Sequence, residues 1–160
     1  NSLLSKISIH AEQKIINNNY DIKYTEPYID YSLDKPPILR LNNWLDENIV
    51  VFGSENILKI NILDASISRI ERANSDKKKF AEKSEYFYEI HFVIEFVLID
   101  DNDLILAIVK AESTNSTTSS KYISINEKER IIDELILNSL EDISNKSEEL
   151  FKKHMIEFML

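Results

Sequence analysis

EYFYEIHFVIEFVLI, residues 85–99, is the stretch of this sequence that decides the fold. Every even-numbered residue from Tyr86 to Leu98 is apolar or aromatic, whereas polar residues such as Glu89 and Glu95 occur only at odd-numbered positions. Successive side chains of a strand point to opposite faces of the sheet, so the pattern predicts a strand with one covered face. Its aromatic and β-branched content predicts a central strand.

The neighbouring segments predict a three-strand meander around this strand. Asn56–Glu71 is rich in Ile and also alternates, with a change of parity near Leu63 and Asp64 that indicates a β-bulge. The Ser/Thr tract Ser113–Ser120 is expected to continue the third strand. The predicted order is first strand, charged hairpin loop, central strand, turn and third strand: Asn56–Glu71, Arg72–Ser84, Glu85–Ile99, Asp100–Asp103 and Leu104–Ala111.

One helix is predicted before the meander and another after it. A proline in the first turn lacks only an N–H that would be unpaired anyway, and apolar residues then follow helical spacing, so a helix is expected over Pro37–Val51. Gly53, the only glycine, is expected to cap its C-terminus. The second helix is expected over most of Glu127–Leu160, with Ser124 or Asn126 as its N-cap.

The N-terminal segment is expected to be extended, with one strand over Leu3–Ile16. The fold class is therefore α+β: an antiparallel meander sheet of about four strands, packed against a short helix and a long C-terminal helix. We expect one domain, 1–160, composed of an extended segment with a strand (1–35), the first helix with the meander (36–126) and the long helix (127–160).

Composition excludes several classes of function. The chain has no cysteine, which excludes disulfides, thiolate nucleophiles and cysteine-ligated metals. A single glycine excludes the glycine-rich loops that bind phosphate. A formal net charge of −9 argues against nucleic acid as a partner. No apolar run approaches the roughly 18 residues of a membrane-spanning helix.

The candidate catalytic and metal-binding residues are better explained by structure. The cluster Asp100–Asp103 lacks the glycine and the bidentate Glu of a calcium loop, so a hairpin turn is favoured. The paired carboxylates Glu95 and Glu112 would serve acid–base chemistry only inside a cleft. The three histidines lie on separate elements: His10, His91 and His154. We therefore expect no catalytic, cofactor-binding or metal-binding residues, no cofactor and no enzymatic activity.

Two sets of residues are candidates for partner binding. A helix over Glu127–Leu160 would be roughly 50 Å long at about 1.5 Å per residue, longer than a small sheet covers, and the polar interval Ser144–Glu149 predicts a kink or a departure from the domain. The apolar stripe beyond it would need a partner to cover it: Phe151, Met155, Phe158 and Met159. The second set is the hydroxyl-rich strand end with Ser113, Asn115 and Thr117, which is either a polar strand end or an edge that pairs with another chain.

Several short motifs carry a resemblance to a known family: Pro36-Pro37 before Trp44-Leu45, LKINILDAS at 58–66, the strand around Tyr88, Ala111-Glu112-Ser113, and Asn126-Glu-Lys-Glu-Arg130. The chain resembles an uncharacterised family of alphaproteobacterial envelope proteins. Its order of elements is similar to that of periplasmic lipoproteins of the lipopolysaccharide-assembly (LptE-like) and ABC-transport auxiliary kinds. The resemblance implies a signal peptide and an acylated cysteine upstream.

These observations lead to two functional hypotheses. The first is a non-enzymatic periplasmic adaptor or assembly subunit, in lipid or lipopolysaccharide transport or outer-membrane assembly, tethered by an upstream lipid anchor; the alternative location is the cytoplasm. It would bind an envelope protein, with lipid as a further partner and self-association through the C-terminal helix as an option. The second is a small-molecule or lipid-binding domain with a pocket between sheet and helices, under Phe92, Ile94 and Phe96.

Overall fold

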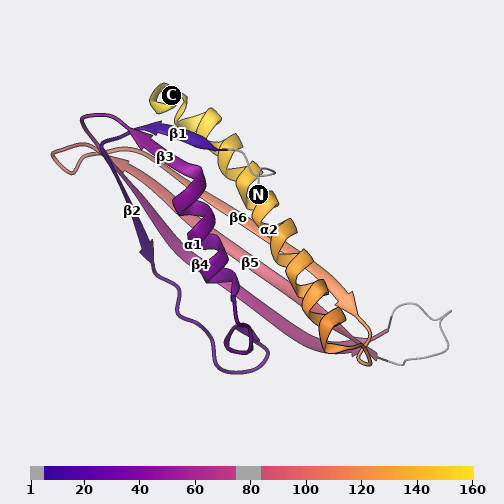
Figure 1. The fold of residues 1–160 in the computed structure, drawn as a ribbon. Helices are drawn as coiled ribbons and strands as arrows, with labels where there is room; N and C mark the ends of the chain where they lie inside the picture. The colour runs from indigo at the N-terminus through magenta and orange to yellow at the C-terminus, as the bar shows by residue number, and fades with distance from the viewer. Residues whose placement is uncertain (1–5, 75–83) are drawn as a thin grey trace.

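A computed structural model of the chain describes residues 6–74 and 84–160 (Figure 1). Leu3 and most of the loop expected over Arg72–Ser84 lie outside these residues, so the structure covers those two predictions only in part. The elements in chain order are β1 (Ile7–His10), β2 (Gln13–Asn18), η1 (Asp30–Ser32), α1 (Pro37–Asn48), β3 (Ile49–Phe52), β4 (Ile57–Ala73), β5 (Ser84–Ile99), β6 (Ile105–Ser119), α2 (Ile125–His154) and η2 (Ile156–Phe158).

The main sheet has four strands in the order β2-β4-β5-β6. The meander β4-β5-β6 is antiparallel, and β5 is central, as the alternation of residues 85–99 predicted. The register shifts between Ile62 and Asp64, which confirms the predicted bulge. β2 adds the fourth strand and pairs parallel to β4. The predicted α+β class with a mostly antiparallel sheet and two packed helices is therefore confirmed.

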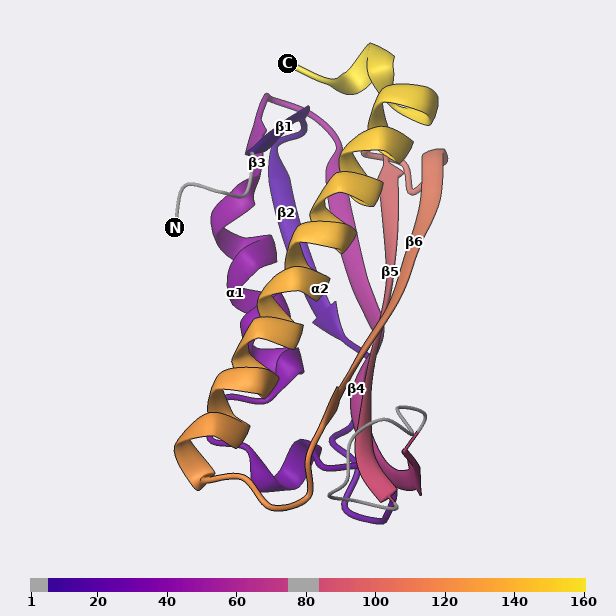
Figure 2. The ribbon, with the colours of Figure 1, turned by 90° about the vertical axis from the view of Figure 1, so that its right-hand side faces the viewer.

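Both helices cover the same face of the sheet, with α1 over the β2–β4 side and α2 along β6 (Figure 2). The even-numbered residues of β5 point into this layer, where Tyr88, Phe92 and Phe96 are fully buried. The other face carries polar side chains: Asn17 Nδ2 donates to Asn61 Oδ1 at 2.9 Å, and Asn61 Nδ2 donates to a carboxylate oxygen of β5 at 3.1 Å. The core therefore lies on one side of the sheet.

The single strand predicted over Leu3–Ile16 is wrong. The chain forms β1, which pairs parallel with β3 in a separate two-stranded sheet, and then β2, which joins the main sheet. Ala11 N–H donates to Phe52 O at 3.2 Å, and Glu12 N–H donates to Asn56 O at 2.9 Å. These bonds hold the crossing between the two sheets, which alternation of side chains alone does not reveal.

The first helix ends three residues earlier than predicted, at Asn48. The β-branched run that follows it forms β3, because such residues favour a strand and β1 supplies its backbone partners. Gly53 is therefore not a helix cap. It follows β3, where a Cβ atom would lie 3.2–3.3 Å from the backbone of Ala11, so the close approach of the two chain segments favours glycine.

The second helix is continuous over Ile125–His154, and its N-cap is Ser124, whose Oγ accepts the Glu127 N–H at 3.1 Å. The kink or departure predicted at Ser144–Glu149 is absent. Ser144 and Ser147 are buried, because small hydroxyl side chains let the helix lie close to the rest of the domain. No helix in the described ranges is both long and apolar enough to cross a membrane. The division into one domain of three segments stays a prediction.

Candidate functional site

The apolar stripe at the end of α2 is covered by the domain itself. Phe151 and Met155 are fully buried, and the Phe151 ring packs edge-to-face on Phe96 with centroids 4.6 Å apart. Met159 is half-buried and forms an isolated bridge with Ile9 of β1. The expectation that this stripe outruns the core is therefore wrong, because η2 folds the chain end back onto β1. Partner binding by these residues and by half-buried Phe158 stays a prediction.

The second predicted set lies on β6, an edge strand that pairs only with β5 in the described part of the chain. Ser113, Asn115 and Thr117 lie on the face toward α2, opposite buried residues of β5. Ser113 is buried, and its hydroxyl has no hydrogen-bond partner among residues 6–74 and 84–160. Asn115 Nδ2 donates to Asp142 Oδ2 of α2 at 3.3 Å. The structure thus places all three residues along one border between strand and helix.

A groove of about 360 Å³ runs along this border. Its lining comes from the edge strand and from successive turns of the helix: Asn115, Ser116, Thr117, Thr118, Arg130, Ile131, Glu134, Leu135 and Asn138. Two of the predicted partner-binding residues, Asn115 and Thr117, therefore lie in a groove whose other wall sequence reasoning did not identify. Ile131 and Leu135, four residues apart on α2, provide the apolar part of that wall.

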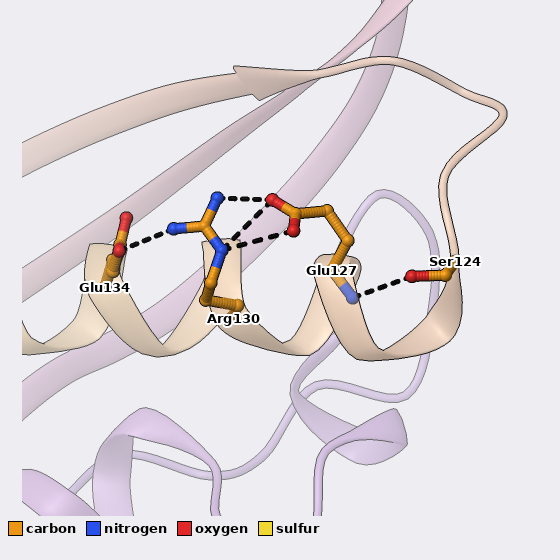
Figure 3. A network of polar contacts seen from close by, with 4 residues as sticks. All are labelled: Ser124, Glu127, Arg130 and Glu134. Atoms are coloured by element: carbon orange, nitrogen blue, oxygen red, sulfur yellow. Dashed lines mark hydrogen bonds and ion pairs between the residues drawn. The ribbon is translucent and has the colours of Figure 1, made fainter.

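An exposed ion-pair network lies on α2, where Figure 3 shows Arg130 between Glu127 and Glu134. Arg130 and Glu134 also line the groove. Arg130 contacts Glu127 through Nε and Nη2 and Glu134 Oε1 through Nη1 at 2.6 Å. The hydrogen bond from Arg130 lowers the pKa of the Glu127 carboxyl, and the two carboxylates raise the pKa of Arg130. The guanidinium is therefore already neutralised by two anions. The i, i+3 and i, i+4 spacing of these charges was the sequence signal for this network.

The open face of the sheet carries a histidine between two carboxylates. His91 Nδ1 lies 3.2 Å from Asp64 Oδ2, and Nε2 lies 3.9 Å from Glu112 Oε1. The carboxylates meet opposite nitrogens of the ring, so they do not converge on a position where an ion would sit. Within residues 6–74 and 84–160, no group of three His, Cys, Asp or Glu residues is arranged to hold a metal.

The acidic cluster after β5 stabilises a turn, as predicted. Asp100 Oδ1 accepts the N–H groups of Asn102 and Leu104 at 2.8 and 2.9 Å. Asp101 Oδ1 accepts the N–H of Asn56 at 3.2 Å, which ties this turn to the start of β4. These carboxylates therefore bond to backbone donors.

The pocket expected under Phe92, Ile94 and Phe96 does not coincide with either hollow described in the structure. All three side chains are fully buried and lie in the core under α2. A hollow of about 330 Å³ lies instead between η1 with its following loop and α2, lined by Ser32, Leu33, Asp34, Lys35, Glu129, Ile132, Asp133 and Ile136. Its lining combines charged residues with apolar ones.

A buried acid also lies outside the predicted set. Asp30 is 1% exposed; it accepts the hydroxyl of Tyr20 and the N–H of Ile67 at 3.1 Å. Burial raises the pKa of Asp30, and burial together with the hydrogen bond to Asp30 raises the pKa of Tyr20. Both hydrogen-bond partners of Asp30, Tyr20 and Ile67, belong to the protein itself. We therefore infer that Asp30 has a structural role and holds the N-terminal segment against β4. A lone Asp in a polar segment gave no sequence signal for this role.

Comparison with known proteins gives structural similarities only. No protein-family model and no curated protein matches the sequence. The chain is similar to rare lipoprotein B from Shewanella oneidensis (14% identity, 89% of this chain and 100% of that chain, TM-score 0.39). It is also similar to an uncharacterized lipoprotein B from Nitrosomonas europaea (15%, 88% and 82%, TM-score 0.42) and to a minor lipoprotein from Acinetobacter baumannii (8%, 86% and 87%, TM-score 0.41).

These three neighbours are bacterial lipoproteins. With identities of at most 15% and TM-scores below 0.5, the similarities carry neither residue roles nor an activity to this chain. The function has to be argued from the residues of the chain itself.

Proposed function

We propose that this chain is a non-enzymatic envelope protein that acts as an adaptor or assembly subunit and binds a protein partner along the β6 edge. The observation that supports this proposal is the length of that edge. β6 has 15 residues and pairs only with β5 in the described ranges. A long strand edge exposes a row of backbone donors and acceptors, which another chain is suited to pair with.

The proposed location is the periplasmic side of the envelope, with a lipid anchor upstream of Asn1, and the proposed process is lipid or lipopolysaccharide transport or outer-membrane assembly. This location rests on the family resemblance of the sequence motifs. The net charge of −9 fits the proposal that a protein, rather than nucleic acid, is the partner.

A small-molecule or lipid-binding domain is the alternative. The hollow between η1 and α2 favours it, since Ile132 and Ile136 give this hollow an apolar wall. However, four charged side chains also line it (Asp34, Lys35, Glu129 and Asp133), and ligand pockets are mostly apolar. The adaptor hypothesis is therefore preferred.

Site-specific photo-cross-linking in the native cells tests the proposal. The full-length protein would carry the photoreactive residue in turn at Ser116 in the Ser/Thr half of β6, at Ile108 on the same exposed face in the other half of β6, and at Leu137 on α2. We expect a discrete cross-linked protein in the envelope fraction, formed most strongly from Ser116. Recovery of the protein as a free monomer, with no cross-link from any of the three positions, would contradict an adaptor role.

A further inference from the structure

In the part of the chain that the structure describes, the outer edge of β6 over Ser113–Ser119 lacks the usual protection against strand pairing. Natural edge strands are blunted by Lys, Pro, bulges or covering segments. The stretch Ser113–Ser119 contains no charge and no proline, and it runs in regular register beside β5 from Phe92 to Tyr86. Its register shift lies at the other end of β6, near Ile99. This half of the edge is therefore regular and accessible to another strand.

The groove above this edge has the right position for the side chains of an added strand. A strand beside β6 would lie about 4.8 Å from it, and its side chains would point alternately to the two faces of the sheet. On the helix side they would enter the groove between Thr117 and the residues Ile131 and Leu135 of α2. The groove is thus bounded by backbone on one side and by a partly apolar helix wall on the other.

The position of α2 disfavours a second copy of this chain as the occupant. α2 packs along β6 far more than along β5. Antiparallel pairing of two β6 edges would place both α2 helices on the same face, only about one strand spacing of 4.8 Å apart. Packed helices need about 8–10 Å between their axes. A strand without an accompanying helix meets no such obstacle.

The charges around the groove indicate which side chains the added strand of the partner would carry. Arg130, the only cation in the groove lining, is held between Glu127 and Glu134 and has no unneutralised charge to offer an anion. The edge itself is uncharged from Ser113 to Ser119, and the whole chain is acidic. An acidic segment is therefore disfavoured. Short polar and β-branched side chains suit the Ser/Thr edge and the helix wall.

We propose that Ser113–Ser119 and α2 form a strand-addition site that binds an extended, uncharged segment of the partner protein as a fifth strand beside β6. This inference rests on the proposed adaptor function and adds the site and the chemistry of the bound segment. Backbone hydrogen bonds to β6 provide the affinity, and alternate side chains in the groove provide the specificity.

Overlapping synthetic peptides test this site directly. They would be about ten residues long, the upper range of a strand, and would cover the partner identified by cross-linking. Binding to purified protein containing residues 1–160 would be measured by fluorescence anisotropy. We expect one uncharged segment to bind, and N-methylation of alternate peptide nitrogens to abolish binding. This peptide control does not depend on the folding of any variant.

Two matched variants of β6 show whether the peptide binds on the groove side of the strand or on its exposed side. Thr117→Lys inserts a charge into the groove, and Thr114→Lys places the same charge on the opposite, exposed face. Because an unpaired charge at a closed interface costs more than 1.4 kcal/mol, we expect Thr117→Lys to weaken peptide binding at least about tenfold. Thr114→Lys should change it by less than about twofold, since its side chain remains in solvent.

The results of the cross-linking and peptide experiments test the strand-addition site and the adaptor function separately. A partner that cross-links but yields no binding peptide, or equal effects of the two Lys variants, would overturn the strand-addition site and leave the adaptor role standing. Cross-links from Ser116 only to another copy of this chain would overturn the proposed occupant. The absence of any cross-link from the three labelled positions would overturn the adaptor function, and this inference with it.

Discussion

The buried contact of Asp30 with Tyr20 and Ile67 provides the sharpest test of how the N-terminal segment is held. Asp30 accepts one hydrogen bond from the Tyr20 hydroxyl and one from the Ile67 N–H. Tyr20 and Ile67 are themselves buried, at 5% and 0% exposure. The substitution Asp30→Ala would therefore leave two donors without partners in the interior.

The magnitude follows from the number of orphaned groups. Each buried polar group left without a partner costs about 1–3 kcal/mol, so Asp30→Ala should lower the free energy of unfolding by about 2–6 kcal/mol. That is a large share of the roughly 5–15 kcal/mol that stabilises a typical domain. Asp30→Asn retains an oxygen for the Ile67 N–H and an amide that donates to Tyr20, so its cost should be about 1 kcal/mol or less.

Urea unfolding at pH 7, followed by circular dichroism and tryptophan fluorescence, measures both variants against the wild type. Trp44 is buried in α1 and reports on the packed state of the core. Stability of Asp30→Ala within 1 kcal/mol of wild type would refute the reasoning, as would equal destabilisation by Ala and Asn.

The pH dependence of Asp30 has a defined sign. Burial raises the folded-state pKa of Asp30 above its unfolded value, so the native state binds this proton more tightly. The stabilising contribution is fully present below the unfolded pKa of about 3.9 and is lost as the pH rises through the folded pKa. Unfolding titrations at several acidic pH values should show the wild type losing stability relative to Asp30→Asn as the pH increases. A gain relative to Asp30→Asn would show that the sign is wrong.

Four further substitutions test three other contacts by thermal or urea unfolding. Phe151→Ala should cost about 3–5 kcal/mol, because it removes a fully buried ring packed on Phe96; a loss below 1 kcal/mol would mean that this end of α2 is not in the core. Ser124→Ala should lower the free energy of unfolding by about 1 kcal/mol, because Ser124 is the N-cap of α2, whereas Asn126→Ala should change it little. The reverse order would show that Asn126 is the N-cap instead. Lys14→Met should cost about 1–3 kcal/mol, since the ammonium donates to backbone carbonyls at the end of α1; a neutral effect would show that these bonds contribute nothing net.

Local patterns predicted the central elements well because their cause is local. The alternation of residues 85–99 arises from the two faces of a strand, and one of these faces is buried. The change of parity near Leu63 marks a bulge because one inserted residue reverses which side chains point inward. Ser124 was one of two candidate caps, and its hydroxyl reaches the N–H of Glu127 three residues on.

The sequence predictions that were wrong or incomplete all depend on contacts between segments far apart in the chain. Ile49–Phe52 continues the apolar spacing of α1, and it forms β3 only because β1 lies beside it. The stripe of Phe151 and Met155 was expected to be exposed, since the sequence does not show that the chain end returns to β1. The sequence predicted Asn115 and Thr117 as edge residues but not the α2 residues that form the other wall of their groove. The two walls are far apart in the sequence and lie side by side only in the folded chain.

By itself, the sequence determined the three strands of the meander, the existence of the two helices and which face of β5 is buried, because periodicity of side chains is imposed within each element. The tertiary structure alone decided the parallel pairing of β2, the burial of Asp30 and the groove between β6 and α2. Each of these depends on segments far apart in the chain, and their proximity comes from burying a shared apolar layer, a non-directional force that leaves no local signature.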